Sequence, residues 1–354
     1  MDHVIALQQL LQVHIPWNRA RVNFTARFVV ALITMSSVNF TQLALVLNPG
    51  AATLSNYRRL QRFFNGYQVD RHSLTRFLLM LLPQQGPWVL TMDRTMWRFG
   101  GRYHNILLIG VCADGIAIPL VWRILPKEGC SNTKTRIALL EELFQHIDPS
   151  NVAALVADRE FVGSSWLRYL KNRGLRFAIR IRKSLYISTR NGRRVRAHRM
   201  VAHLKAGQVL ALRNRRLCCG QRLFVCAIGP AKGHDPVILL SSEPAHRALA
   251  FYRKRWQVET FFAAIKSRGF NLEATHISDP ERIAKLMGLL AIAFTWAYRV
   301  GLWVHQHLKP IAVKSHGRRA QSLFRYGLDR LREAFITRTQ QKQLAKYIQI
   351  LSCT

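Results

Sequence analysis

Residues 152–158 read VAALVAD, and residues 88–93 repeat the pattern as WVLTMD. Short apolar runs of this kind are typical of buried strands. One run ends at Asp158 and the other at Asp93. If the two strands are neighbours in one sheet, both carboxylates emerge at the same edge, where they repel each other unless a cation bridges them. The alternative is that each aspartate only caps the segment that follows it. The chain has only 18 acidic residues in 354, and this scarcity favours the metal site.

Further strands and helices are expected around these two runs. Asp114-Gly115 lies between two apolar runs and is a strong hairpin-turn signal. Asn132 or Thr133 is expected to cap a helix, whereas Asp70, Asp148 and Asp279 have the sequence context of caps or turns. The predicted order is strand, hairpin, helix, strand, helix, strand, which indicates a mixed α/β fold. The ranges are 88–92, 106–113, 116–124, a helix after residue 132, 152–157, about 164–173, and a strand within 175–184.

A second group of residues lies on a helix predicted from Pro244 to about Ser267. At 100° per residue, Tyr252, Arg255, Glu259 and Lys266 fall on one narrow face of that helix. An ordinary ion pair between Arg255 and Glu259 is the simpler explanation, but it leaves the other two residues as a coincidence. Glu259 is therefore the third acidic residue of interest.

The charge of the chain predicts a polyanionic partner. It has 53 Lys and Arg against 18 Asp and Glu, a formal net charge of +35. The basic residues are spread over the whole chain, which favours a nucleic-acid backbone over a membrane surface. Residues 286–304 approach the length of a membrane span, but Arg299 interrupts them and a buried helix is favoured. The six cysteines, Cys353 among them, have no zinc-ligand spacing and are expected to be idle thiols.

The two ends of the chain and a middle segment complete the prediction. Residues 1–85 are expected to be helical, with a short helix at 41–47 and a basic helix after Ser55. Such a pair either enters a DNA groove or forms an ordinary helical hairpin with a solvated basic face, and the sequence leaves both open. Residues 184–243 combine strand-like runs, glycine turns and many arginines, so we interpret them as a β-rich insertion.

Three carboxylates suit the cleavage of phosphodiester bonds. The reaction needs an activated water or 3′-hydroxyl and a stabilised leaving oxygen, and two Mg²⁺ ions about 3.5–4 Å apart provide both. Mg²⁺ prefers carboxylate oxygens, so Asp93, Asp158 and Glu259 are the candidate ligands. Arg255 and Lys266, beside the third carboxylate, are candidates for gripping the adjacent phosphates.

At these residues the chain resembles the transposases of the IS4 family of bacterial insertion sequences, which are DDE transposases. Tyr252, Arg255, Glu259 and Lys266 match that family's Tyr-x2-Arg-x3-Glu-x6-Lys signature at every position and gap. The segments that begin at Asp93 (DRTMW) and Asp158 (DREF) resemble the motifs around its two catalytic aspartates. The segment 55–64, which contains Arg58, Arg59 and Arg62, resembles its N-terminal basic helix.

The resemblance implies an RNase H-like catalytic core interrupted by the β-rich insertion. It divides the chain into a helical DNA-binding region (1–85), the first part of the core (86–183), the insertion (184–243), the core helix with the catalytic glutamate (244–285) and a C-terminal helical region (286–354). It also implies that an aromatic residue stacks a flipped base. Trp97, Trp256 and Tyr186 are the candidates for that role, and core packing is the favoured alternative for each.

The implied function is a DNA transposase that binds the terminal inverted repeats of its element and catalyses cleavage and strand transfer. Asp93, Asp158 and Glu259 would be the catalytic residues and would hold two Mg²⁺ ions, with Mn²⁺ as a substitute. The expected DNA contacts are Tyr252, Arg255, Lys266, Arg58, Arg59, Arg62, Arg193, Arg194 and Arg196. A homodimer in the synaptic complex and a cytoplasmic, nucleoid-associated location are also expected. The alternatives are a metal-dependent nuclease without strand transfer and an inactive DNA-binding protein.

Overall fold

The computed structural model describes residues 2–99, 101–315, 317–337 and 341–351, and these fold into two compact units. The unit that contains the large sheet, here called the sheet unit, comprises Gln84–Thr95 and Ile106–Val258. The other, called the helical unit, comprises Met1–Pro83, Met96–Asn105 and Glu259–Thr354. Cys353 lies outside the described residues. The two units cut across the five predicted regions, and that fivefold division stays a prediction.

The sheet has nine strands, and its path runs in the order β3-β2-β1-β4-β5-β11-β10-β8, with β9 paired to β10. Its first five strands are β1 (Trp88–Phe99), β2 (Arg102–Ala113), β3 (Ile116–Leu125), β4 (Val152–Ala157) and β5 (Phe177–Arg180). Asp114 and Gly115 both adopt positive φ, +41° and +92°, between β2 and β3. Two consecutive residues with positive φ form the tight hairpin turn that the sequence predicts, so that prediction is confirmed.

The two apolar runs are neighbours in the sheet, as the sequence analysis anticipated. β1 pairs in parallel with β4, with Met92 opposite Ala157, and β4 pairs in parallel with β5, with Ala157 opposite Ile179. One expectation is wrong. The first strand does not end before Asp93 but continues to Phe99. Because β2 extends along β1 past the point where β4 stops, the backbone of β1 stays extended there, and Asp93 lies inside a strand.

The predicted β-rich insertion contains six strands and one short helix. These are β6 (Tyr186–Ser188), β7 (Arg194–Arg196), α8 (Ala197–Val201), β8 (Val209–Ala211), β9 (Arg216–Cys218), β10 (Gln221–Ile228) and β11 (Val237–Ser241). β11 pairs antiparallel with β5 and β10 pairs antiparallel with β11, so these strands extend the core sheet instead of forming a separate one. Only β6 and β7 pair as a detached hairpin among the described residues.

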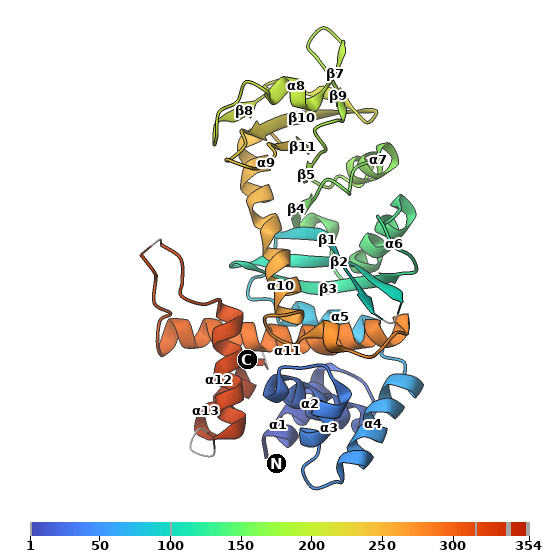
Figure 1. The fold of residues 1–354 in the computed structure, drawn as a ribbon, viewed down its shortest axis with the longest axis vertical. Helices are drawn as coiled ribbons and strands as arrows, with labels where there is room; N and C mark the ends of the chain where they lie inside the picture. Colours follow the sequence, from blue (N-terminus) through green and yellow to red (C-terminus); the bar gives the residue numbers. More distant parts are fainter. Residues whose placement is uncertain (1, 100, 316, 338–340, 352–354) are drawn as a thin grey trace. The chain divides into compact units, whose positions relative to one another are not determined.

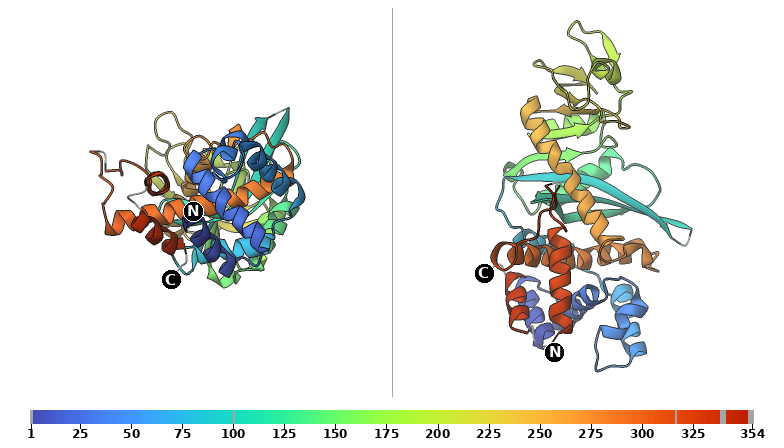
Figure 2. Two further views of the ribbon diagram at one scale, coloured as in Figure 1. Left: turned by 90° about the horizontal axis from the view of Figure 1, so that it is seen from below. Right: turned by 60° about the vertical axis from the view of Figure 1, so that its left-hand side comes forward.

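Helices cover both faces of the sheet (Figures 1 and 2). α9 (Ala245–Tyr252) packs on β4, β5, β10 and β11, where Val89, Val156 and Ala178 meet Ala248 and Tyr252 in a buried apolar cluster. α6 (Thr133–Phe144) and α7 (Ser164–Asn172) lie on the opposite face and contact each other. Asn132 caps α6 by accepting a hydrogen bond from the Thr135 N–H at 2.8 Å, which confirms one of the two predicted caps. The cysteines in the described part of the chain are unpaired.

The helical unit is built around one long helix, α11 (Pro280–His307). Its other helices include α1 (Asp2–His14), α2 (Arg19–Met35), α3 (Phe40–Val46), α4 (Thr53–Gly66), α5 (Arg71–Met80), α12 (Leu323–Ile336) and α13 (Gln341–Leu351). α11 crosses α12 where Gly301 meets Gly327. A Cβ on Gly327 would lie 1.8 Å from the Ala297 carbonyl oxygen, so only glycine allows this approach. Asp70 and Asp279 cap α5 and α11, as expected.

α11 is long and apolar enough to cross a membrane, but 83% of its most apolar window is buried. α2 and α3 pass the same test only as a pair bent by 107°. The core helices of many proteins pass such a test on length and composition alone, so it is weak evidence for a span. The burial of Leu286, Leu290 and Phe294 agrees with the buried helix predicted for residues 286–304.

Candidate active site

Strand register brings Asp93 and Asp158 together on one face of the sheet. Asp93 follows Met92, Asp158 follows Ala157, and those two residues are register partners in adjacent parallel strands. Side chains alternate between the faces of a strand. Asp93 therefore lies on the same face as Val89, and Asp158 on the same face as Val156, which is the face covered by α9. Arg180 on β5 extends this row to a third strand, because Ala157 pairs with Ile179.

Asp93 is largely removed from water, with 15% of its side chain exposed. Its Oδ1 accepts a hydrogen bond from the Arg94 N–H at 2.8 Å, and its Oδ2 accepts one from Arg255 Nη1 at 3.2 Å. Burial raises the pKa of Asp93 to about 6, although the Arg94 hydrogen bond and the Arg255 charge oppose the rise. The negative charge of Asp158 adds to the rise. The two carboxylates therefore interact electrostatically.

Asp158 has fewer partners than Asp93. Its Oδ1 lies 4.0 Å from Arg180 Nη1, which is too far for a hydrogen bond. This oxygen is buried and has no hydrogen-bond partner among the described residues. An acceptor without a donor is costly to bury. The row thus holds two neighbouring carboxylates with a guanidinium at each side and one carboxylate oxygen that lacks a partner.

This arrangement fits a divalent cation. Carboxylate oxygens are the ligands that Mg²⁺ and similar hard cations prefer, and a cation would relieve both the repulsion between the aspartates and the unpartnered Asp158 oxygen. In the described part of the chain, no three His, Cys, Asp or Glu side chains gather tightly enough to hold a metal ion. The predicted third ligand, Glu259, lies in α10 (Gln257–Ile265), and the unit boundary falls between Val258 and Glu259. Its role as a ligand stays a prediction.

The helix predicted for residues 244–267 is not continuous, which corrects the sequence analysis. α9 ends at Tyr252, a 3₁₀ turn, η2 (Arg253–Trp256), follows, and α10 begins at Gln257. The uniform 100° spacing therefore does not hold across the signature. Within the tighter turn, Arg255 is buried and points to Asp93, and the Lys254 carbonyl accepts a hydrogen bond from Cys112 Sγ at 3.4 Å. These tertiary contacts account for the break in the helix.

The other two signature residues, Tyr252 and Lys266, contact well-defined neighbours. Tyr252 is 6% exposed and belongs to the apolar cluster beneath α9, and burial raises its pKa to about 12. Lys266 donates to the Met96 carbonyl at 3.2 Å, pairs with Glu273 at 3.0 Å and lies 5.6 Å from the Trp97 ring centre. Their predicted contacts with DNA phosphates are not tested by these geometries.

Sequence reasoning missed a second ion pair beside the aspartates. Arg94 Nε lies 3.1 and 3.2 Å from the two Glu160 carboxylate oxygens, and Arg94 Nη2 lies 2.9 Å from one of them. Arg136, which is buried, donates to the Glu160 carbonyl at 3.0 Å and lies over the Phe161 ring. The signal was present in the sequence, because Arg94 directly follows Asp93 and Glu160 lies two residues after Asp158 in their motifs. Arg180 was missed as well, because its place depends on strand register.

The predicted DNA contacts outside the signature are exposed basic residues. Arg58, Arg59 and Arg62 lie on the solvent side of α4, whose Leu60, Phe63 and Phe64 are buried. Arg193, Arg194 and Arg196 are exposed at the β6–β7 hairpin, where two of them lie over the Tyr186 ring at 5.4 and 5.9 Å. Among the candidates for base stacking, Trp97 is 8% exposed, whereas Trp256 is 59% and Tyr186 46% exposed.

Comparison with known proteins identifies the family. The family described as "Transposase DDE domain" matches residues 84–296, more than half of the chain. A structure of the piggyBac transposase synaptic complex with hairpin DNA is 12% identical and matches over 99% of this chain and 83% of that chain, with a TM-score of 0.44. Endonuclease V from Bacillus subtilis is 13% identical over 64% of this chain and 92% of that chain, with a TM-score of 0.28. No curated protein sequence matches the chain.

The site and the family match together define a DDE-type nuclease of the transposase class. The chain belongs to the transposase DDE domain family, and the protein is a DNA transposase. Its mixed α/β sheet in the order β3-β2-β1-β4-β5 is the RNase H-like core that the resemblance implied. Both TM-scores are below 0.5, so this identification depends on the family match alone. Membership of the IS4 family stays a prediction.

Asp93→Asn should stabilise the metal-free protein at neutral pH. Since the folded pKa of about 6 exceeds the usual 3.8, the Asp93 contribution to stability is complete below pH 3.8 and is lost as pH rises through 6. At pH 7.5 the ionisation of Asp93 lowers the free energy of unfolding by on the order of 3 kcal/mol, and asparagine, which does not ionise, avoids this loss. In urea titrations with EDTA, the free energy of unfolding of the variant should exceed that of wild type at pH 7.5 and equal it at pH 4. A variant that is equal or weaker at pH 7.5 would contradict the environment described for Asp93.

Arg255→Lys should impair cleavage even though it keeps the charge. The Arg255 guanidinium reaches Asp93 while it lies 4.6 Å from the Trp256 ring centre, and an ammonium cannot reproduce this planar geometry. We expect single-turnover cleavage to fall at least about tenfold for lysine and further for alanine, in line with the cost of misplacing a catalytic group. Arg253→Lys, in the same turn but exposed, is the matched control. Equal rates for the two lysine variants would remove Arg255 from the site.

Proposed function

We propose that this transposase binds the terminal inverted repeats of its own insertion sequence, cleaves DNA at those ends and joins them to a target. The observation that carries the proposal is the pair Asp93 and Asp158, side by side on adjacent parallel strands of a DDE transposase domain. Two neighbouring carboxylates with an unpartnered oxygen suit a reaction that depends on divalent cations. DDE transposases generally use such ions, and we infer Mg²⁺, with Mn²⁺ as a substitute.

In this proposal Asp93, Asp158 and Glu259 hold two ions and are the catalytic residues. Such ions, when bound, activate the attacking water or 3′-hydroxyl and stabilise the leaving oxygen. The sheet contributes rigidity, because both aspartates belong to or directly follow strands anchored by Val89 and Val156 in the apolar cluster. Arg255 orients Asp93 through its hydrogen bond at 3.2 Å. The Arg94–Glu160 pair keeps a third nearby carboxylate neutralised.

DNA is the proposed partner, and several basic surfaces support it. The net charge of +35 favours a polyanion. The exposed arginines of α4 and of the β6–β7 hairpin are the proposed contacts with the phosphate backbone. Tyr252, Arg255 and Lys266 are proposed to position the phosphates next to the scissile bond. Pairing of two element ends requires two copies of the protein, so we infer a homodimer in the synaptic complex, in the cytoplasm with the nucleoid.

Replacing any of the three proposed ligands should abolish cleavage. Asp93→Asn, Asp158→Asn and Glu259→Gln each remove a charged oxygen ligand but leave the basic surfaces intact, so binding of the ends should stay within about twofold. The substrate is a labelled duplex that carries the repeats flanking the gene, and both cut and joined products are measured. Asp235→Asn, an exposed aspartate paired with Lys183 at 3.0 Å, is the control. Near wild-type cleavage by one variant would exclude that residue as a metal ligand. Cut products that are never joined to a target would favour a nuclease over a transposase that transfers strands.

The affinity for duplex DNA should fall steeply with salt. Each phosphate that the protein neutralises contributes a slope of roughly −0.9 to the logarithm of the binding constant against the logarithm of salt concentration. Arg193→Gln, Arg194→Gln and Arg196→Gln combined should therefore lower the slope by up to about 2.7. Arg71→Gln, whose guanidinium already pairs with Glu281 at 2.8 Å, should leave the slope unchanged. A wild-type slope near zero would contradict the proposed binding of DNA.

A further inference from the structure

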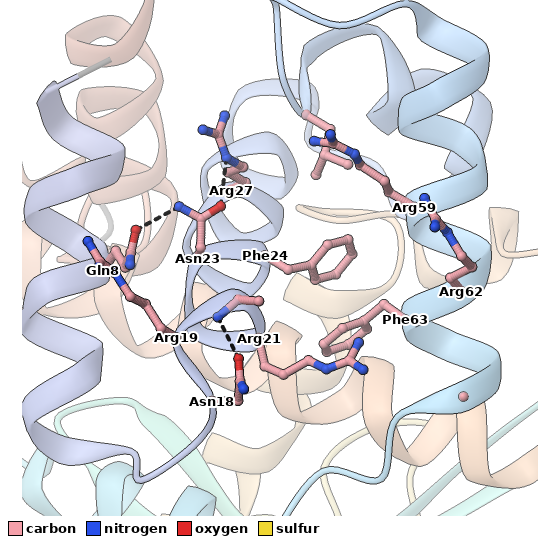
Figure 3. A pocket seen from close by; sticks show the side chains of 13 residues that line it. Gln8, Asn18, Arg19, Arg21, Asn23, Phe24, Arg27, Arg59, Arg62 and Phe63 are labelled. Carbon is pink, nitrogen blue, oxygen red and sulfur yellow. Dashed lines mark hydrogen bonds between the residues drawn. The ribbon is translucent and has the colours of Figure 1, made fainter.

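The helical unit contains a pocket of about 870 Å³ whose walls are unusually rich in arginine (Figure 3). Arg19, Arg21 and Arg27 come from α2, and Arg59 and Arg62 come from α4. Its described lining residues include no Asp or Glu. The sequence analysis singled out the two α4 arginines but not those of α2, which the fold brings to the same cavity. Five guanidinium groups around one hollow are a strongly positive site.

In the part of the chain that the structure describes, no carboxylate neutralises any of these five arginines. Among the described residues, no Asp or Glu oxygen lies within 4.0 Å of their nitrogens. Elsewhere in the same unit arginines do pair, as Arg71 does with Glu281 at 2.8 Å and Arg325 with Asp329 at 3.0 Å. Burial and the neighbouring charge of Arg59 lower the pKa of the Arg27 guanidinium. The cations of the pocket thus repel one another and lack a counter-charge of their own.

Neutral groups hold two of the pocket arginines, Arg21 and Arg27, in place. Arg27 donates from Nε to Asn23 Oδ1 and from Nη1 to Asn48 Oδ1, both at 3.0 Å, and Asn23 in turn donates to Gln8 Oε1 at 2.6 Å. Arg21 lies over the Tyr67 ring at 4.6 Å. Amide partners orient the Arg27 guanidinium and an aromatic ring orients that of Arg21, without cancelling the charge of either group. Such a preorganised set of donors suits a tetrahedral oxyanion, which accepts paired hydrogen bonds from guanidinium groups.

Aromatic side chains form the apolar wall of the pocket. Phe24 stacks on Phe63 with ring centres 4.2 Å apart and an angle of 17° between the planes. Figure 3 shows Phe24 between the α2 and α4 arginines. Arg19, Arg59 and Arg62 are exposed at the rim, whereas Arg21 and Arg27 are half-buried deeper in the wall. This grading from rim to wall suits an extended polyanion that lies across the opening and sends one or more phosphates inward.

We propose that this arginine pocket binds phosphates of the DNA backbone, with α2 and α4 gripping the same segment of a bound duplex. The proposal rests on the proposed function, which supplies DNA as the partner. It adds Arg19, Arg21 and Arg27 to the predicted contacts and makes α2 part of the DNA-binding surface. It also separates Arg59 and Arg62, which line the pocket, from Arg58, which does not. Phosphate contacts of this kind position a protein on DNA without reading its sequence.

Two double variants of the full chain test the pocket. Arg59→Gln/Arg62→Gln removes rim cations, and Arg21→Gln/Arg27→Gln removes wall cations. Each should weaken duplex binding at least about tenfold in low salt and lower the salt slope by about 2, since two phosphate contacts are lost. The matched control, Arg71→Gln/Arg325→Gln, removes the same total charge from arginines that are already paired. Binding is followed by fluorescence anisotropy of a labelled duplex, and thermal melting checks that each variant folds.

A second titration, with inorganic tripolyphosphate, separates DNA from a free phosphate compound as the occupant. Tripolyphosphate should compete with the duplex for wild type and lose that effect in the pocket variants. Pocket variants that bind duplex as tightly as the control would overturn the proposal, even if they lose tripolyphosphate binding, since the pocket would then serve a free phosphate compound. A wild-type protein that binds no duplex would overturn the proposed function itself. If Arg21→Gln/Arg27→Gln lowers the melting temperature, the duplex affinity of Arg59→Gln/Arg62→Gln, whose replaced side chains are exposed, decides whether the pocket binds DNA.

Discussion

The site depends on one constraint of strand register, which sets two like charges side by side in a largely buried row. Met92 and Ala157 are partners, so the next residue on each strand is an aspartate, and alternation turns both to the face beneath α9. Water cannot screen this repulsion well at that depth. Arg255 at Asp93 and Arg180 near Asp158 offset part of it, yet the Asp158 Oδ1 keeps no donor among the described residues. The residues of this row therefore do not form a fully paired ion-pair network, and the unpartnered carboxylate oxygen suits a bound cation.

Local chemistry made much of the fold predictable. The tight turn at Asp114-Gly115, the Asn132 cap and the apolar strand 152–157 each follow from interactions within a few residues, and the structure has them as expected. Long-range pairing was not predictable in this way. β1 continues past Asp93 alongside β2, which corrects the expected end of that strand. The insertion is β-rich as predicted, but its pairing with the core sheet through β11 and β5 was not foreseen. Likewise, the 3₁₀ turn before α10 reflects the contact of Arg255 with Asp93, which helical periodicity alone does not reveal.

The acidic residues of the candidate site were predictable from the sequence, whereas its basic residues were not. Few acidic residues are available, so two that end apolar runs stand out, whereas 53 Lys and Arg conceal the few that matter. Arg94 and Arg180 gain their meaning only when separate segments meet, at Glu160 and at Asp158. The same holds for the α2 arginines, whose common pocket with α4 exists only in the folded helical unit. A functional residue of a rare type can therefore be singled out from the sequence, whereas one of an abundant type needs the folded structure.

The positions of the acidic residues also explain why some basic surfaces are not neutralised. Asp70 and Asp279 cap helices, and Glu141, Glu281 and Asp329 pair with arginines, so few carboxylates are left to neutralise the rest. A large net charge destabilises a compact chain through self-repulsion. In the arginine pocket this repulsion is concentrated, because amides instead of carboxylates hold Arg27. A bound polyanion would remove the repulsion and fill the open hydrogen-bonding positions at once. Unfavourable charge in the free protein and affinity for phosphate are thus two consequences of the same arrangement of residues.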